Sequence, residues 1–336
     1  MNSKSDGDAK SPLKLLEAIS ALFVAIVAFI KGPLKESIRQ SYVVMKNEIK
    51  KYFSGKRMLV FTILMGAIIF ILAVAPYLFG GTAKSYYFVA VASLIVLMAS
   101  TLFASISIVS EYEERTALIV FTRPIRKISI FIGKLLACLF LTIGFTFLYY
   151  MVAVLVGAIV DHSFNADMMA SFGMACCYAF ATTGVAMLVS SLMKKGSTAT
   201  IITFVILAVI LMAVSLVLSG TSVDTSWVLY DAAESIEYAS SDFRDFTNQM
   251  LDDLSKMLSD PTQFLIPNWR EVVLASALIQ PDAFVDLLNS VWGLKYSPMD
   301  LGQVGEPDYV HDIIVMLAWG FVGIVGAFVA FLRREF

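Results

Sequence analysis

The chain has 336 residues, of which 58% are hydrophobic and only 15% are charged, and its mean hydropathy is +0.78. Soluble domains carry roughly 25% charged residues, so this composition excludes a soluble globular protein and indicates an integral membrane protein. The formal net charge of −2 is too small to indicate a partner by itself. We expect the lipid bilayer as the immediate surroundings and no nucleic-acid partner.

An apolar run near the N-terminus is the first predicted element. It covers residues 15–30, after a polar tail over residues 1–14. Sixteen residues that include Glu17 are few for a membrane crossing, although the run is apolar almost all round, so a spanning and an interfacial helix both fit. Residues 37–57 follow as a basic amphipathic helix at the cytoplasmic surface.

Six longer apolar runs predict membrane-spanning helices. A helix needs roughly 20 apolar residues to cross a hydrocarbon core about 30 Å thick, and these runs are far too long for barrel strands. The runs cover residues 59–79, 86–109, 129–160, 168–192, 198–218 and 312–332. We therefore predict an all-α integral membrane protein with a six-helix transmembrane bundle, its first five spans within 59–218 and its sixth at 312–332.

Lysine and arginine gather in segments that fall alternately on one side of these spans. Residues 31–57 hold eight Lys/Arg against two acids, the loop 111–127 holds four, Lys194 and Lys195 join spans four and five, and Arg333 follows span six. By the positive-inside rule this side is the cytoplasm. We predict a multi-pass protein of the plasma membrane with a cytoplasmic C-terminus; if residues 15–30 also cross, the N-terminus lies outside.

Residues 219–310 form an acidic segment on the opposite side, with fifteen Asp/Glu against four Lys/Arg. Apolar residues recur in it at roughly helical spacing. Within 268–293, Asn268 and Glu271 have capping-box spacing, and Pro281 and Gly293 mark a helix restart and a helix end. The segment therefore predicts a small helical extracytoplasmic domain before the last span.

A dense charge cluster separates spans two and three. Ser110 and Glu113 have capping-box spacing, and the acids of this stretch fall in a first helical turn, where the helix dipole favours anions. Pro124 disfavours helical geometry at Arg123, so the helix ends there. We predict a short helix over 110–123 whose charges face the cytosol. The alternative is a solvated loop whose positive charges only fix the topology.

The order of span, Glu-rich short helix and "TRPIRKISIFIGKLL" resembles the permease subunits of ABC-2 type transporters. The residues that match the family pattern are Glu111, Thr116, Arg123, Pro124, Arg126, Gly133 and Lys134. Arg115 departs from it, because the family usually has glycine there. Residues 37–57 similarly resemble the basic helix that precedes the family's first span.

The resemblance implies that helix 110–123 is a coupling helix, which in that family contacts a separate cytosolic ATPase. The residues expected to take part are Glu111, Glu113, Glu114, Arg115, Thr116, Arg123, Pro124 and Arg126. It also implies pairing with a second permease copy or a homologous permease, and export. We expect a non-catalytic subunit without a cofactor, with ATP bound by the partner, because the Gly-Lys pairs at Gly55 and Gly133 lack the rest of a phosphate loop.

Two other functions compete with this one. A structural or regulatory membrane subunit without transport activity would make the charged helix replaceable. An intramembrane protease would use the adjacent Glu113 and Glu114, but the two histidines, His162 and His311, fall at the other membrane boundary, too far away to share a metal with these glutamates.

Other polar and small residues receive weaker predictions. Lys134 lies near a span end, where its amine can reach the interface by snorkelling. Asp308, His311 and Asp312 fit either a metal site or a hydrated helix start. Small residues at four-residue spacing favour close helix contacts, either within the chain or at a dimer seam: Gly173, Cys177 and Ala181 in one span, Gly323 and Ala327 in another.

Overall fold

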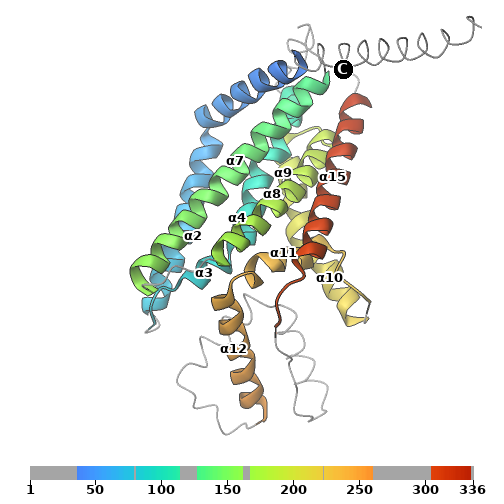
Figure 1. The fold of residues 1–336 in the computed structure, drawn as a ribbon. Helices are drawn as coiled ribbons and strands as arrows, with labels where there is room; N and C mark the ends of the chain where they lie inside the picture. The colour runs from blue at the N-terminus through green and yellow to red at the C-terminus, as the bar shows by residue number, and fades with distance from the viewer. Residues whose placement is uncertain are drawn as a thin grey trace, which may run out of the picture.

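The structure is a computed structural model that describes residues 36–78, 81–113, 127–161, 167–221, 223–259 and 304–333. The tail 1–14, the apolar run 15–30 and the candidate helices within 268–293 lie outside the described residues. The described residues are helical and contain no strand. Figure 1 shows them as a bundle of long helices with further helices at one end.

Six helices of the described residues are long and apolar enough to cross a membrane, which confirms the predicted all-α bundle. They are α2 (Lys56–Leu78); α3 to α5 (Ser85–Val89, Ala92–Ser107, Val109–Glu113); α7 (Lys127–Val156) with the π-helical turn η1 (Gly157–Asp161); α8 (Asp167–Leu192); α9 (Gly196–Phe204), the π-helical η2 (Val205–Ile210) and α10 (Leu211–Gly220); and α15 (Tyr309–Arg333). Span two is thus an interrupted helix, whereas span five is continuous and contains a π-helical stretch.

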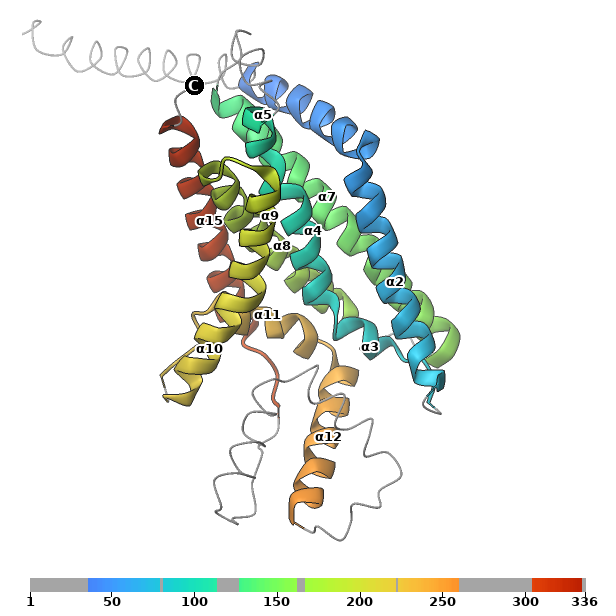
Figure 2. The ribbon, with the colours of Figure 1, turned by 180° about the vertical axis from the view of Figure 1, so that it is seen from behind.

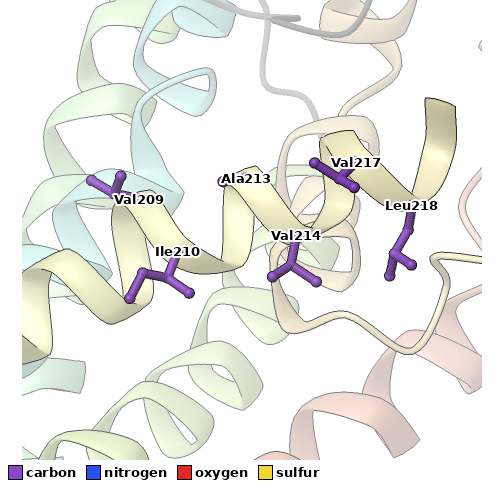
Figure 3. Close-up of a pocket in the computed structure, with 6 residues that line it drawn as sticks. All are labelled: Val209, Ile210, Ala213, Val214, Val217 and Leu218. Atoms are coloured by element: carbon purple, nitrogen blue, oxygen red, sulfur yellow. The ribbon is translucent and has the colours of Figure 1, made fainter.

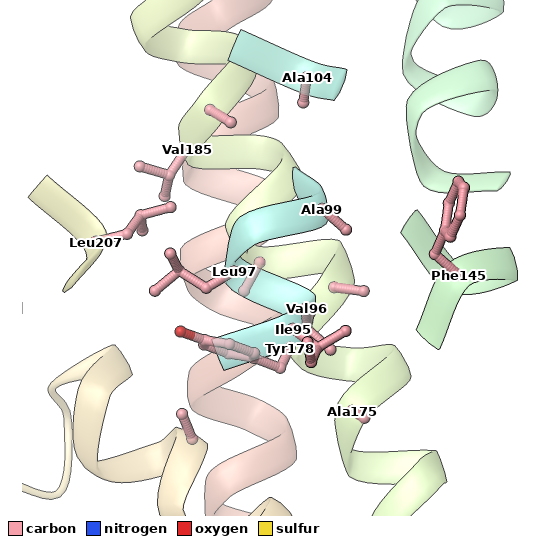
Figure 4. Packing of buried hydrophobic residues seen from close by; sticks show 14 of the residues in the cluster. Ile95, Val96, Leu97, Ala99, Ala104, Phe145, Ala175, Tyr178, Val185 and Leu207 are labelled. Carbon is pink, nitrogen blue, oxygen red and sulfur yellow. The ribbon is translucent and has the colours of Figure 1, made fainter. Parts of the chain in front are cut away.

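Helices α4 and α8 form the centre of the bundle. They are the most buried of the six spans, and α2 is the least buried. Figure 4 shows residues of α4, among them Ile95 and Ala99, packed beside Tyr178 and Val185 of α8. Apolar side chains of α2, α7 and η2 complete this core. Polar residues in the spans are mostly serine and threonine whose hydroxyls bond to their own helix, as Thr101 does to Leu97 O.

The closest contact between two spans joins α8 and α15. A Cβ added to Gly323 would lie 2.6 Å from the carbonyl carbon of Gly184, and one added to Gly184 would lie 2.5 Å from Gly320 O. Ala327 is fully buried on the same helix. Of the two predicted roles for Gly323 and Ala327, packing within the chain is the one that the structure favours, while Gly173 has no atom within 4 Å of an added Cβ.

The two ends of the bundle differ in charge. We call the end at which Lys51, Lys127, Lys194 and Arg333 lie the basic end (Figure 2, top). At the opposite, acidic end, α11 (Leu229–Tyr238) packs against α4, α8 and α15, and α12 (Ser241–Ser259) projects away from the bundle. The cytoplasmic location of the basic end remains a prediction from the positive-inside rule.

Candidate functional site

The charge cluster at the basic end begins where the helix of span two is interrupted. The helix of span two breaks at Ile108, and α5 starts at Val109. The Ser190 hydroxyl of α8 accepts hydrogen bonds from the backbone N–H groups of Ile108 and Val109, at 3.1 and 3.2 Å. A side chain from another span thus satisfies the two donors that the break exposes, and it fixes where α5 begins.

Lys134 of α7 lies at the centre of the cluster, and its side chain is fully buried. Its ammonium donates to Glu48 Oε1 at 2.6 Å and to Ser107 O at 2.9 Å, and it forms an ion pair with Glu111 Oε1 at 2.8 Å. An ammonium has three donors, so these three acceptors satisfy it completely. The side chains of Glu48, Glu111 and Lys134, which we call the Lys134 triad, join three separate segments of the chain.

The Lys134 triad corrects two predictions. Lys134 does not snorkel to the interface, because its side chain has no solvent exposure and its charge is paired inside the bundle. Glu111 does not face the cytosol, because its side chain is only 8% exposed and pairs with Lys134. Breaking a buried pair leaves an uncompensated charge, so the pairing with Lys134 holds Glu111 within the bundle.

The helix over residues 36–54, which we call helix 36–54, lies against α7 and α4 at the basic end, and its carboxylate Glu48 belongs to the triad. A Cβ added to Gly133 would lie 2.7 Å from Ser41 O and from Val44 Cβ, so glycine is required for this close approach. The Tyr52 hydroxyl donates to Phe103 O at 2.7 Å. Gly133 therefore allows α7 to pack closely against helix 36–54, and the adjacent Lys134 forms an ion pair with Glu48 of the same helix.

Glu113 makes the second connection of the charged segment. Its Oε2 accepts a hydrogen bond from Gly196 N at 2.8 Å, at the first residue of α9. Lys195 precedes that residue and makes no side-chain capping bond. A carboxylate at a helix N-terminus satisfies a free backbone donor and complements the helix dipole. Residues 111–113 are thus attached to α7 through Lys134 and to α9 through Gly196.

The structure describes two of the eight residues expected to take part in coupling. It brings Glu111 and Glu113 together at the basic end. The other six lie outside the described residues: Glu114, Arg115, Thr116, Arg123, Pro124 and Arg126. Glu48 was not among the predicted site residues, although a lysine within an apolar run is a signal that a buried acid lies nearby.

A second buried acid lies at the acidic end. Ser93 Oγ of α4 donates to Glu237 Oε1 of α11 at 2.7 Å, and Tyr149, Tyr150 and Tyr178 lie close enough to interact with this carboxyl electrostatically. Burial raises the pKa of Glu237 to about 8; the Ser93 hydrogen bond opposes the shift, and the nearby Glu234 adds to it. Glu237 is therefore a neutral acid in the folded protein over most of the physiological range.

We expect the bundle to lose stability as the pH rises from about 4.5 to about 8, in part because of Glu237. Over that window the unfolded chain, with the ordinary pKa of 4.5, releases a proton that the folded protein retains, so unfolding becomes more favourable. The Glu237→Gln variant should melt with a weaker pH dependence than the wild type in detergent. The exposed Asp245→Asn change serves as the control, and a Glu237→Gln protein with the wild-type slope would contradict the assignment.

Two further candidates do not form sites among the described residues. The Asp308 carboxylate accepts a hydrogen bond from His311 N at 3.2 Å and so caps α15, as the helix-start interpretation predicts. Figure 3 shows a shallow hollow along one helix, η2 and α10, whose lining is wholly apolar: Val209, Ile210, Ala213, Val214, Val217 and Leu218. With no polar group to orient a ligand, it fits a surface that lipid or another helix covers.

The comparison with protein families agrees with the geometry. The family model described as ABC-2 family transporter protein matches residues 78–336, which is more than half of the chain and includes five of the six spans found among the described residues. No individual curated protein matches the chain. The matched region begins at Leu78, the last residue of α2, and so leaves out helix 36–54. The pairing between Glu48 and Lys134 therefore joins a segment before the match to a segment within it.

Proposed function

The chain belongs to the ABC-2 family of transporter proteins, and from this premise we propose that it is the permease subunit of an ATP-driven exporter whose ATPase is a separate cytosolic chain. Its basic end would then face the cytoplasm, in keeping with the positive-inside rule. The segment 110–126 would bind the ATPase, and two permease subunits would pair to form the transport pathway.

The attachment of residues 111–113 is the observation that carries this proposal. Glu111 is bound to Lys134 of α7, and Glu113 is bound to the first residue of α9. Through Glu48 the same triad also includes helix 36–54. A displacement of this segment would therefore move three parts of the bundle together, which is the mechanical property that a coupling element requires.

We infer the following cycle. ATP-driven closure of two ATPase subunits pushes the segments 110–126 of the two permeases. Each push is transmitted through Glu111 to α7 and through Glu113 to α9, so the two bundles tilt about their interface and alternate access to the pathway. Binding of ATP shifts the equilibrium between the two arrangements of the permease bundles only as far as the ATPase binds one arrangement more tightly than the other.

The local structure also bears on the competing functions. The Gly133–Lys134 pair, which superficially resembles part of a phosphate loop, contacts helix 36–54 and its Glu48. For the protease alternative, His311 lies at the start of α15 at the acidic end, whereas Glu113 ends α5 at the basic end (Figure 2). This separation gives Glu113 no part in a metal site with His311.

The partner is tested by purifying the tagged full-length chain from native membranes in a mild detergent. We expect an ATPase with a phosphate-binding loop to co-purify in stoichiometric amounts, and the complex to hydrolyse ATP. If the chain purifies from its native membranes without any nucleotide-binding protein, in several mild detergents and after chemical cross-linking, then the structural or regulatory subunit becomes the better account.

A further inference from the structure

The face of helix 36–54 that points away from the bundle carries two stripes of different chemistry. An α-helix has 3.6 residues per turn, so residues that are three, four, seven or eleven positions apart lie along one stripe of its surface. Ile38, Tyr42, Ile49 and Phe53 follow this spacing, and so do Arg39, Lys46 and Lys50. The first set forms an apolar stripe and the second a basic stripe directly beside it.

Both stripes are accessible in the structure. Of the apolar stripe, the side chains of Ile38, Tyr42 and Phe53 are 61–62% exposed and that of Ile49 is half-buried. Arg39, Lys46 and Lys50 are exposed too, and within the described residues they form no ion pair or hydrogen bond. The chain itself therefore gives neither stripe a partner in the part that the structure describes.

The bundle fixes which way the stripes face. Gly133, the Lys134 triad and Tyr52 hold the opposite side of helix 36–54 against α7 and α4. Passing around the helix from that side, one meets the apolar stripe, then the basic stripe, and then a mainly polar flank with Glu36, Asn47 and Ser54, in which Val43 is the exposed apolar residue. This is the order of protein, acyl chains, headgroups and cytosol that an interfacial helix meets.

The axis of the helix fits this arrangement. Figure 1 shows helix 36–54, in the darkest blue, running obliquely across the basic end, whereas α2 turns down along the bundle. The change of direction occurs at Gly55, which interrupts the helix before Lys56. A helix that crosses the end of a membrane bundle lies at the level of the lipid headgroups.

We propose that Arg39, Lys46 and Lys50 form a binding stripe for the phosphate groups of anionic lipids in the adjacent leaflet, with the apolar stripe inserted among the acyl chains. Of the two acids of helix 36–54, Glu48 is held in the triad and Glu36 lies on the polar flank, three residues before Arg39. The three bases of the stripe therefore keep a net positive charge, which complements a negatively charged lipid surface. Because the Lys134 triad ties this helix to residue 111, bound lipid would also hold the coupling segment in place.

The proposal is tested on the purified full-length protein. Each variant is equilibrated with mixed micelles that contain equal amounts of phosphatidylglycerol and phosphatidylcholine, recovered on affinity resin, and analysed for both bound lipids by mass spectrometry. We expect the wild type to be enriched in phosphatidylglycerol. The R39Q/K46Q/K50Q variant should lower the ratio of the two bound lipids about tenfold, and 1 M salt should lower the wild-type ratio similarly.

Two control proteins make the result specific. K84Q/K194Q/K195Q removes three positive charges elsewhere and should stay within about twofold of the wild type, while R39K/K46R/K50R keeps the charge and should keep the ratio. An R39Q/K46Q/K50Q protein with the wild-type ratio, or a control that loses as much, would overturn the proposal. So would loss of ATPase co-purification with no change in bound lipid, because the stripe would then be a protein contact.

Discussion

Replacing Lys134 by methionine is expected to lower the free energy of unfolding by about 3–5 kcal/mol, because it leaves two carboxylates buried without their counter-charge. The side chains of Glu48 and Glu111 are only 12% and 8% exposed, and Ser107 O would also lose its donor. Methionine has nearly the length of lysine, so the loss reflects charge more than volume. Unfolding in mixed micelles with increasing SDS measures the difference.

The neutral triple variant E48Q/K134M/E111Q tests whether the loss comes from unpaired charge. Replacing a whole buried ion cluster is often neutral or stabilising, so this protein should recover most of the stability that K134M loses. Lys194→Met, at an exposed position of the same end, should stay within about 0.5 kcal/mol of the wild type. A K134M protein as stable as the wild type would mean that the triad does not form.

Gly323→Ala is expected to destabilise the bundle by about 1–3 kcal/mol, although alanine is the better helix former by about 1 kcal/mol. The added Cβ would lie 2.6 Å from Gly184 C and 2.7 Å from Val185 N, and both are backbone atoms that no rotamer change can move. Helices α8 and α15 must therefore separate. Thermal melting in detergent, followed by size-exclusion chromatography, measures the loss.

The matched control is Gly173→Ala in α8. An added Cβ there meets no atom within 4 Å, so the same substitution should leave stability unchanged or raise it slightly. A loss of stability for Gly323→Ala without a loss for Gly173→Ala is the expected result. Equal effects at both positions would show that helix propensity, and not the close approach of α8 and α15, decides the outcome.

The spans were predictable from the sequence because a membrane imposes one strong condition, a long apolar run for each helix. That condition located the runs now seen in α2 and α15, for example. It does not report interruptions: the break at Ile108 is stabilised by Ser190 of another span, which no local pattern reveals. The break between α3 and α4, inside the predicted span 86–109, was not predicted either.

The charged site was only partly predictable. Glu111 and Glu113 stood out by their spacing, but their partners Lys134 and Gly196 come from distant segments. The rule that an intramembrane lysine needs an acid could have pointed to Glu48, whereas the same lysine near a span end also fits snorkelling. The pKa of Glu237 depends on how α11 docks, so the sequence alone gave no sign of it.

The most direct test of the coupling assignment is ATP hydrolysis by the ATPase complex in native membranes that contain the E114K/R123E variant. Glu111 is left intact because it is part of the buried triad. The assignment predicts that this protein folds normally yet loses both ATPase binding and ATP hydrolysis, while K84E/E306K, which reverses one base and one acid at the acidic end, retains both. Wild-type binding and hydrolysis by E114K/R123E would contradict it.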